Sequence, residues 1–414
     1  MKIVVVNAAD AGGGAERISF SLAQGLRERG HTVSFLCGQA RHPSSRAMMG
    51  PADWVLGRTI KRIGYADAVS LAAWRFLDYP EVREADLIHF HNLHGFYFGL
   101  AMLPKILAAK PCVWTLHDCW ALSGGCYWQL DCDNWLDSCK PCPGHGAHPI
   151  TGVLDTASAM LRLKRSCYRA LVRHGGLMTG VSAWMTARIE RAFAAAGVDT
   201  SRIRCLPNFV DIPAEDGARP ALPDSLSSSG RPIVLLVAAD INNRSKGMAT
   251  ALGALQRNLD ASFVLVTVGA PFAEADLQAH GLSGRTVQLG RLDDRRDLAA
   301  IYRAATVTLV PSRAESFCLV AAESIACGTP VIASDVMALP DLVPEGRTGF
   351  LAKAGDPEDF SRKLRLIFEM EPDRYAELRA ATRQFASERF ISHAQWLDGY
   401  LAMYERAISE HVNL

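Results

Sequence analysis

Two glutamates eight residues apart carry the clearest chemistry in the sequence. Glu315 lies in a loop that follows the apolar run 307–310, and Glu323 lies about one turn inside a helix expected to begin near Leu319. Carboxylates accept hydrogen bonds from hydroxyl groups, and the free amides at a helix N-terminus bind phosphate oxygens. A sugar joined to ribose through a diphosphate offers both kinds of group, so this segment is a candidate site for such a ligand.

Histidines follow two apolar runs in the first half of the chain. His91 lies in the segment 88–95, and His117 and Asp118 follow the run 112–116. An imidazole at a strand end can bond a sugar hydroxyl or polarise a leaving group. We take His117 as the preferred catalytic candidate, although a lone histidine at a strand end is more often structural.

Three adjacent glycines, residues 12–14, precede a helix expected over residues 18–29. Because they have no side chains, Gly13 and Gly14 allow a ligand to approach the helix N-terminus closely. Their spacing is not that of a dinucleotide-binding fingerprint. The loop is a candidate acceptor or phosphate contact, and a simple tight turn is the alternative.

Cysteines cluster in an insert at residues 119–148. Cys139 and Cys142 are separated by two residues, a spacing suited to tetrahedral metal ligation, and Cys126 and Cys132 can complete four thiolates. Zinc or an iron–sulfur cluster would fit this set. We expect a structural zinc, with a disulfide or free thiols as the alternative. Because protein ligands would fill all four positions, the metal would hold a loop together and would not catalyse.

The composition describes a large and nearly neutral chain. Its 414 residues, 49% of them hydrophobic, exceed the usual length of one domain. The 44 basic and 43 acidic residues give a formal net charge of +1, so no overall field attracts nucleic acid. No uncharged apolar stretch approaches ~20 residues, and the N-terminal run is too short for a signal segment. These features predict a cytoplasmic protein with no nucleic-acid partner.

Short apolar runs alternate with helical patterns in both halves of the chain. Continuous apolar runs between helices indicate parallel sheets covered on both faces, whose ligands bind at the carboxyl ends of the strands. The stretch 212–231 is rich in Pro, Ser and Gly and predicts a linker. The expected strands are 2–6, 32–37, 87–90, 112–116, 177–181 and 204–206 before the linker, and 233–238, 262–268, 287–289, 307–310 and 330–334 after it.

Six motifs occur in a fixed order along the chain: Gly13–Arg17, Pro207–Asp211, Lys246-Gly247, Pro311–Glu323, Ala326–Ser334 and Gly349–Leu351. In this order the sequence resembles the retaining GT-B glycosyltransferases of family 4. The resemblance implies an α/β fold of two Rossmann-like, doubly wound parallel-sheet domains that face a central cleft. An acceptor-side domain would span 1–211 and a nucleotide-sugar domain 232–394. The C-terminal helix, 395–414, would cross back to the first domain.

The resemblance also implies roles for single residues. Glu315 would hold the hydroxyls of the donor sugar, Glu323 would hold those of the ribose, and Lys246 would neutralise the diphosphate. His117 matches the histidine that faces the reacting carbon. The remaining donor-binding residues would be Phe317, Cys318, Leu319 and Val320, whose amides meet the diphosphate, together with Asn208.

Two positions depart from the family pattern. The family commonly has an arginine five residues before Lys246, where this chain has Ile241, and Arg244 is expected to substitute for it. Cys318 stands where the family often has glycine, which narrows the phosphate pocket or merely fills it. The cysteine insert resembles that of the colanic-acid-type branch of bacterial exopolysaccharide enzymes, which also shows His-Asp-x-Trp, here residues 117–120.

The implied reaction moves a hexose from a UDP- or GDP-sugar to a glycan or a polyprenyl-diphosphate-linked acceptor, in bacterial cell-surface polysaccharide synthesis. Lys246, Arg244 and helix amides would stabilise the leaving diphosphate, so no cofactor is expected for catalysis. A front-face displacement with retention is the expected chemistry, and a double displacement stays open. A nucleotide-sugar epimerase and a noncatalytic nucleotide-sugar-binding protein are the alternatives.

Two further segments have amphipathic patterns. Residues 41–74 mix basic and apolar side chains, which predicts either a solvated face, the favoured interpretation, or a segment that meets a lipid-linked acceptor at a membrane. The second interpretation would make the protein peripheral at the inner face of the cell membrane. Residues 396–410 predict an amphipathic helix.

Overall fold

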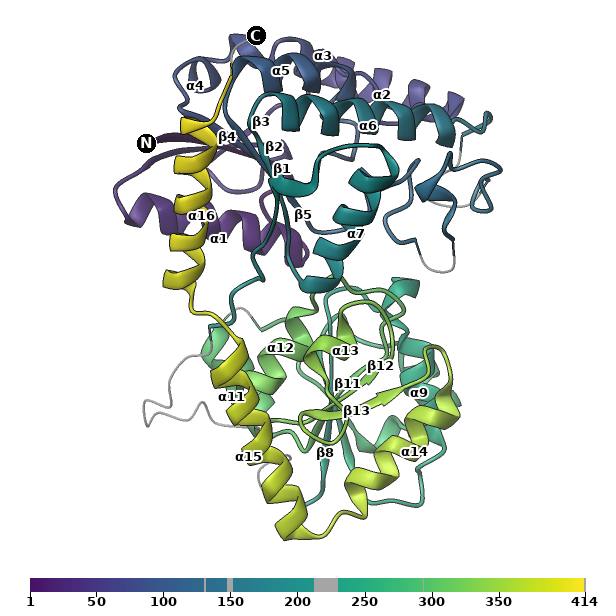
Figure 1. The fold of residues 1–414 in the computed structure, drawn as a ribbon. Helices are drawn as coiled ribbons and strands as arrows, with labels where there is room; N and C mark the ends of the chain where they lie inside the picture. The colour runs from purple at the N-terminus through teal and green to yellow at the C-terminus, as the bar shows by residue number, and fades with distance from the viewer. Residues whose placement is uncertain (130–131, 147–151, 212–229, 293, 413–414) are drawn as a thin grey trace. The chain divides into compact units, whose positions relative to one another are not determined.

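The computed structural model describes residues 1–129, 132–146, 152–211, 230–292 and 294–412. Within them the chain divides into two compact units. Unit 1 contains Met1–Asn208 and Ala394–Leu414, and unit 2 contains Phe209–His393 (Figure 1). Of the expected linker, residues 212–229 lie outside the described residues.

Unit 1 is built on a parallel seven-stranded sheet in the order β3-β2-β1-β4-β5-β6-β7. Strand β1 pairs with β2 on one side and β4 on the other, so that Val6 lies beside Leu36 and Phe90. All three side chains are fully buried, because helices cover both faces of the sheet. The strands are β1 Lys2–Ala9, β2 Thr32–Gln39, β3 Ser45–Ala47, β4 Leu87–Phe90, β5 Cys112–Leu116, β6 Leu177–Gly180 and β7 Ile203–Cys205.

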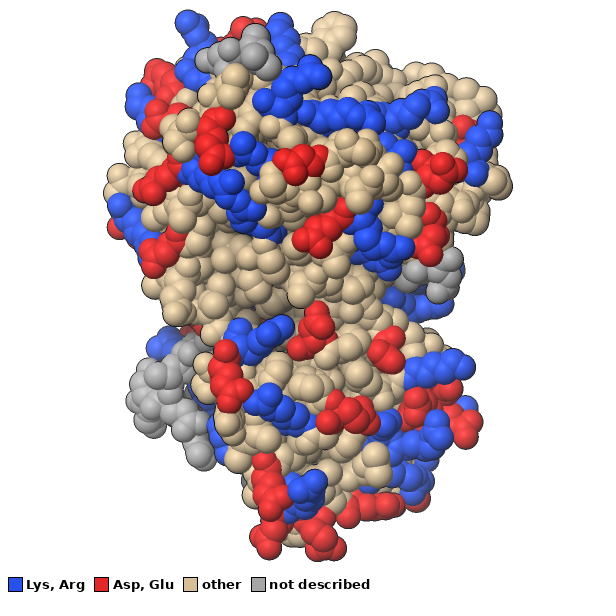
Figure 2. All heavy atoms as spheres, in the orientation of Figure 1, with Lys and Arg blue, Asp and Glu red and all other residues tan. Residues whose placement is uncertain are grey.

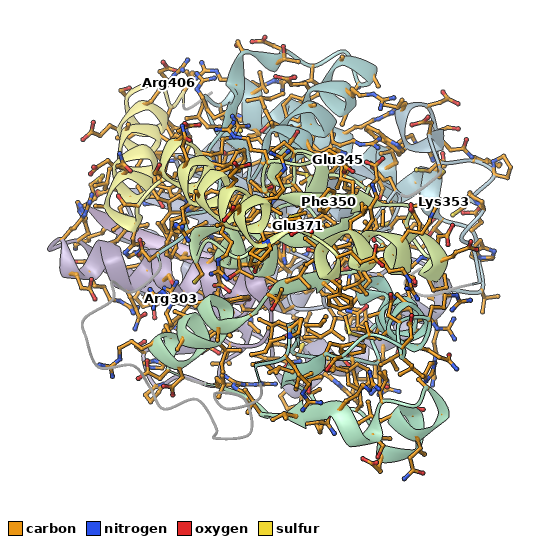
Figure 3. All side chains as sticks on the ribbon, turned by 90° about the horizontal axis from the view of Figure 1, so that it is seen from below. Arg303, Glu345, Phe350, Lys353, Glu371 and Arg406 are labelled. Carbon is orange, nitrogen blue, oxygen red and sulfur yellow. The ribbon has the colours of Figure 1, made fainter. Side chains whose placement is uncertain are left out.

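Unit 2 has a parallel six-stranded sheet in the order β10-β9-β8-β11-β12-β13. Its core includes Leu236, Leu265 and Leu309 from three neighbouring strands. Beside the edge strand β13, Glu345 accepts a hydrogen bond from the amide of Leu351 and pairs with Lys363 at 2.6 Å. Figure 3 labels Glu345 and the strand residue Phe350. The strands are β8 Ile233–Ala238, β9 Val264–Gly269, β10 Thr286–Gln288, β11 Val307–Val310, β12 Val331–Ser334 and β13 Gly349–Ala352.

Helices connect the strands in both units. In unit 1 they are α1 Gly14–Glu28, α2 Pro51–Ile63, α3 Leu71–Trp74, α4 Pro80–Arg83, α5 Leu103–Ala109, α6 Ala157–Arg173 and α7 Ala183–Ala195. In unit 2 they are α9 Met248–Gln256, α10 Glu274–Ala279, α11 Arg295–Ala304, α12 Leu319–Ala326, α13 Leu339–Leu342, α14 Pro357–Phe368 and α15 Pro372–Arg389. The short 3-10 helices are η1 Phe76–Asp78, η2 Leu100–Met102, η3 Trp120–Leu122, η4 Asn134–Leu136, η5 Thr200–Arg202, η6 Arg244–Lys246 and η7 Ser283–Arg285.

The last helix, α16 (His393–Ser409), packs on unit 1 as the sequence predicts. Trp396, Tyr400 and Tyr404 recur every four residues, which places them on one face of the helix, and all three are fully buried. Near the end of α1, Arg29 forms an ion pair with Asp398 at 2.5 Å. Figure 1 shows α16, in yellow, beside α1.

Some predicted boundaries were wrong. Helix α1 begins at Gly14 rather than at residue 18, because the Glu16 carboxylate accepts the amide of Gly13 and caps the helix there. The segment 41–74 contains strand β3 as well as helices α2 and α3. The three-residue strand has no apolar run from which it could have been predicted.

The surface carries both signs of charge. In Figure 2, the blue Lys and Arg side chains and the red Asp and Glu side chains are interspersed over the face shown. This mixture agrees with the formal net charge of +1. In the described ranges, no helix combines the length and the apolar character that a bilayer crossing requires.

Candidate active site

A lysine–glutamate pair lies beyond the carboxyl ends of β8 and β11, two neighbouring strands of unit 2. The Nζ atom of Lys246 lies 2.8 Å from Oε1 of Glu315, and the Ser312 hydroxyl donates to the same oxygen at 2.9 Å. Burial opposes the ammonium charge, yet the Glu315 carboxylate holds the pKa of Lys246 above its ordinary value. The lysine is therefore charged at neutral pH and is held beside a carboxylate.

Backbone contacts fix the position of Lys246. The next residue, Gly247, has a φ of 66°, and a Cβ atom there would lie 1.9 Å from the carbonyl oxygen of Pro311. Only glycine fits this conformation and this approach. The amide of Arg313 also donates to the Ser245 carbonyl at 2.7 Å. These contacts join the loop before α9 to the loop after β11, and so bring the lysine to the glutamate.

The second glutamate lies on α12. Glu323 is 5% exposed, and the hydroxyl of Tyr302, on α11, lies 3.3 Å from its Oε2 atom. At the start of the same helix, Leu319 and Val320 are half-buried, whereas Phe317 just before it is buried. Glu323 is the fifth residue of α12, about one turn after Leu319, and the expected diphosphate contacts at the start of this helix lie in unit 2 with it.

Cys318 has an unusual backbone conformation. It precedes α12 with a φ of 72° and a ψ of 83°, in the left-handed region that glycine adopts without strain. This explains in physical terms why glycine suits the position. Burial raises the pKa of the Cys318 thiol, and the carboxylate of Glu315 raises it further, so the thiol is neutral.

Arg244 and Asn208 are two further predicted site residues. Arg244 is exposed on η6, two residues before Lys246. Asn208 is the last residue of the first segment of unit 1, so it does not belong to unit 2. It is buried, and its Oδ1 atom has no hydrogen-bond partner in the described part of the chain.

In unit 1, three histidines lie in or directly after the adjacent strands β4 and β5, and their rings contact one another in a row. The Nδ1 atom of His91 lies 2.8 Å from Nε2 of His117, and their ring centroids are 5.1 Å apart. The ring of His89 lies 4.2 Å from that of His91. Burial lowers the pKa of His117 to about 4 and holds the pKa of both other histidines well below the ordinary value. The imidazoles are therefore neutral at neutral pH.

The C-terminal helix supports this cluster. Nδ1 of His89 lies 2.7 Å from the hydroxyl of Tyr404, and Nε2 lies 2.7 Å from Oγ1 of Thr115. Thr115 in turn lies 3.1 Å from the hydroxyl of Tyr400. His89, Tyr400 and Tyr404 are not among the site residues predicted from the sequence. The four-residue spacing of the tyrosines on a helix predicted to pack on unit 1 was the available signal.

Asp118 is engaged within unit 1. Its Oδ2 atom lies 3.1 Å from Nε2 of His94, and its Oδ1 atom accepts the amide of Trp120 at 2.8 Å. Burial acts to lower the pKa of His94, but the Asp118 carboxylate outweighs it and the pKa is raised. Asp118 therefore forms an ion pair with His94 and stabilises the first residue of η3.

The glycine loop lies at the start of α1, where Gly13 and Gly14 are exposed. The Gly13 amide donates to the Glu16 carboxylate at 2.9 Å. This carboxylate places negative charge beside the loop and would repel a phosphate there. The geometry therefore favours an uncharged hydroxyl over a phosphate as the ligand of this loop.

The four clustered cysteines line a single cavity of about 320 Å³ in unit 1. All are free thiols. Among the residues that the structure describes, no group of three or more His, Cys, Asp or Glu side chains is already placed to hold a metal ion. The four predicted zinc ligands thus line one cavity, but their side chains are not already arranged around a single metal position.

Comparison with known proteins decides the family. The model of Glycosyltransferase Family 4 matches residues 12–213, and that of Glycosyl transferases group 1 matches residues 219–388. The chain belongs to family 4 of the glycosyltransferases. The predicted retaining glycosyltransferase is thereby confirmed. The first matched range ends and the second begins within the expected linker, 212–231.

Among curated relatives, this glycosyltransferase is 24% identical over 353 residues to WcaC of Escherichia coli (strain K12), whose name assigns it to colanic acid biosynthesis. The match covers 81% of this chain and 83% of WcaC. It is 37% identical over 189 residues to D-inositol 3-phosphate glycosyltransferase 1 of Catenulispora acidiphila, covering 42% of this chain and 44% of that protein. The higher identity is thus confined to less than half of each chain.

Solved structures show the same fold. Sucrose-phosphate synthase of Thermosynechococcus elongatus is 19% identical, covers 98% of this chain and 99% of its own, and has a TM-score of 0.68. Anabaena Alr3699/HepE, in complex with UDP and glucose, is 18% identical with coverages of 98% and 99% and a TM-score of 0.66. The predicted GT-B fold is confirmed.

Proposed function

We propose that this glycosyltransferase moves a hexose from a nucleotide-diphosphate sugar to a glycan or a polyprenyl-diphosphate-linked acceptor. The Lys246–Glu315 pair carries the proposal, because it sets a fixed cation and a carboxylate beyond the strands of unit 2. A diphosphate needs the first group, and sugar hydroxyls need the second. The structure of Anabaena Alr3699/HepE contains UDP-glucose, so UDP-glucose is the first donor to test.

The proposed role of Lys246 is to stabilise the leaving group. Cleavage of the anomeric bond builds negative charge on the diphosphate, and a cation held in place interacts more strongly as that charge grows. The amides of Leu319 and Val320, at the start of α12, would add hydrogen bonds and the field of the helix dipole. We assign Arg244 the part of a second cation, which its exposed side chain would take by turning toward the diphosphate.

The proposed roles of Glu315 and His117 concern the sugar. The Lys246 ammonium and the Ser312 hydroxyl orient the carboxylate of Glu315, which would accept hydrogen bonds from sugar hydroxyls. With a pKa of about 4, His117 is neutral, so it would bond a hydroxyl without repelling the positive charge that develops on the sugar. In a front-face displacement, a departing phosphate oxygen would take the proton of the acceptor hydroxyl.

The acceptor side rests on unit 1. Trp54 and Val55 on α2 are 48% and 59% exposed, and the guanidinium of Arg58 lies over the Trp54 ring. Next to them, the amide of the exposed Val153 donates to the carbonyl of Arg62 at 2.8 Å. Apolar and basic groups that alternate in this way suit the surface of an anionic bilayer. We propose that this surface meets a membrane that carries the acceptor, in bacterial cell-surface polysaccharide synthesis.

A donor screen tests the proposed reaction. We would follow the thermal unfolding of the purified protein with UDP-, GDP- and ADP-sugars, and repeat the screen with Glu323→Ala. One donor should raise the unfolding temperature selectively, and the variant should lose that shift because the ribose hydroxyls lose their acceptor. If no donor shifts the unfolding temperature, the transfer of a nucleotide-linked sugar is contradicted.

A product analysis separates transfer from its alternatives. With the donor found in the screen, we expect release of nucleoside diphosphate that depends on an added lipid-linked or glycan acceptor, and a product with the anomeric configuration of the donor. Conversion of the donor sugar without an acceptor would instead indicate an epimerase. Binding without any turnover would indicate a noncatalytic protein.

A further inference from the structure

The lining of the cavity that contains the four cysteines includes none of the residues assigned a catalytic role. Cys126, Cys132, Cys139 and Cys142 come from one short stretch of the chain, and each contributes to the lining of the same cavity of about 320 Å³. Four soft ligands that face one cavity are the donor set of zinc and of iron–sulfur clusters.

Backbone amides point at two of the sulfur atoms. The amide of Gly124 donates to Sγ of Cys139 at 3.3 Å. The amides of Gly144 and His145 donate to the sulfur of Cys142. Such bonds favour an anionic sulfur over a thiol, because an amide donor stabilises negative charge. They are the interactions that hold ligating thiolates in position around a metal.

Two polar side chains in the cavity wall point to an occupant. Gln129 is 3% exposed, and neither its amide nitrogen nor its amide oxygen has a hydrogen-bond partner among the described residues. Trp135 is 1% exposed, and its indole N–H likewise has no partner in the described ranges. Buried donors without acceptors are unfavourable unless something in the cavity accepts their hydrogen bonds. Metal-bound thiolates or sulfides would do so.

A buried cation can balance the charge of the thiolates. Lys164 on α6 is fully buried, and its ammonium donates to the carbonyls of Trp120 and Ser123 at 2.6 and 2.9 Å. Lys164 is near enough to Cys126 and Cys139 to interact electrostatically with both sulfur atoms. Four thiolates around a divalent ion carry a net charge of minus two, and a buried lysine stabilises such a charge.

We propose that Cys126, Cys132, Cys139 and Cys142 bind a tetrathiolate metal centre that holds the insert to helix α6 and takes no part in the sugar transfer. A single zinc ion would draw the four sulfur atoms to about 3.8 Å from one another, the edge of a tetrahedron with zinc–sulfur bonds of about 2.3 Å. An iron–sulfur cluster would leave them farther apart, because each thiolate then binds a different iron atom. Both occupants use the same ligands and the same counter-charge.

Metal analysis of the full-length protein tests the proposal. The protein would be purified once in air and once without oxygen, and zinc, iron and acid-labile sulfide would be measured per chain, together with the visible absorption spectrum. We expect either one zinc ion per chain or iron with matching sulfide. The first result identifies the single ion and the second identifies the cluster. If neither metal is bound in either preparation, the proposal is overturned.

Variants separate the site from adventitious binding. Cys139→Ser and Cys142→Ser should each lower the bound metal by at least about fivefold, because a closed site loses a ligand. Cys205→Ser is the matched control, since Cys205 is an exposed thiol of the same unit outside the cavity. Equal metal loss in the control would overturn the proposal. So would a disulfide between any two of the four cysteines, found by mass spectrometry of the wild-type protein, whatever the stability of the variants.

Discussion

The candidate residues of unit 2 and those of unit 1 are held in opposite ways. In unit 2, a charged pair is fixed by short contacts between two loops, and the lysine side chain remains 38% exposed. In unit 1, three neutral histidines are buried behind one another and are supported by two tyrosines from the far end of the sequence. The difference is that the candidate residues of unit 2 are charged, whereas the candidate histidines of unit 1 are neutral and tightly packed.

The largest expected effect is the loss of the cation. Lys246→Ala should lower kcat by about 10²–10³-fold, because the leaving diphosphate loses its main charge stabilisation. Initial rates with a saturating donor would measure it. Lys363→Ala is the control, since Lys363 forms a comparable pair with Glu345 in the same unit. If both variants lose activity equally, the charge of the Lys246–Glu315 pair has no special role.

Acidification should destabilise unit 1 through its histidines. His117 has a pKa of about 4 in the folded protein against an ordinary 6.5, so between these values the unfolded chain binds a proton that the folded chain does not. The stabilisation is present above pH 6.5 and is lost as the pH falls toward 4, about 3 kcal/mol in all.

Urea unfolding between pH 4 and 7.5 would measure this loss, and His117→Gln should reduce its pH dependence. All eight tryptophans lie in unit 1, so their fluorescence reports on that unit. The exposed His42 gives the control variant His42→Gln. Equal pH profiles for the wild type and His117→Gln would contradict the neutral, buried histidine.

A smaller effect is expected from the residue behind His117. His91→Ala removes the hydrogen bond to Nε2 of His117 and should lower kcat by about tenfold with little change in KM, because the imidazole loses its fixed orientation. His91→Asn keeps a polar atom near the position of Nδ1 and should recover most of the rate. A change in KM alone, or no recovery with asparagine, would show that His91 does not position His117.

The smallest effect concerns the backbone before α12. Cys318→Ala and Cys318→Gly both remove the thiol, but only glycine relieves the left-handed conformation at φ 72°. The glycine variant should exceed the alanine variant in unfolding free energy by about 0.5–1 kcal/mol, after allowance for the greater freedom of unfolded glycine. Chemical denaturation of the two variants side by side measures the difference. A more stable alanine variant would show that the strain is absent.

Four strands have the bounds that the sequence predicts: β4, β5, β8 and β11. Each is a short, mostly apolar and buried run, so local hydrophobicity indicates both ends. The expected strands omit β3 and β13. The first is a three-residue edge strand with the sequence Ser-Arg-Ala, and the second begins at a glycine, so neither has a pattern that differs from a loop.

The candidate residues of unit 2 follow from local sequence, because each lies in the loop after a strand or in the first two turns of the helix that follows, where ligands of a parallel sheet bind. The cysteine cavity follows in part, since short spacing brings Cys139 and Cys142 together, whereas the unpartnered Gln129 and Trp135 emerge only from packing.

The amino-acid sequence by itself determined the family, the two parallel sheets and the acidic and basic residues of unit 2, because motifs and apolar periodicity are local properties of the chain. Only the tertiary structure decided that His117 is neutral and that His89, His91, Tyr400 and Tyr404 support it. Desolvation and hydrogen bonding depend on which distant segments become neighbours, and α16 reaches His89 across 315 positions of sequence. No local pattern encodes that contact.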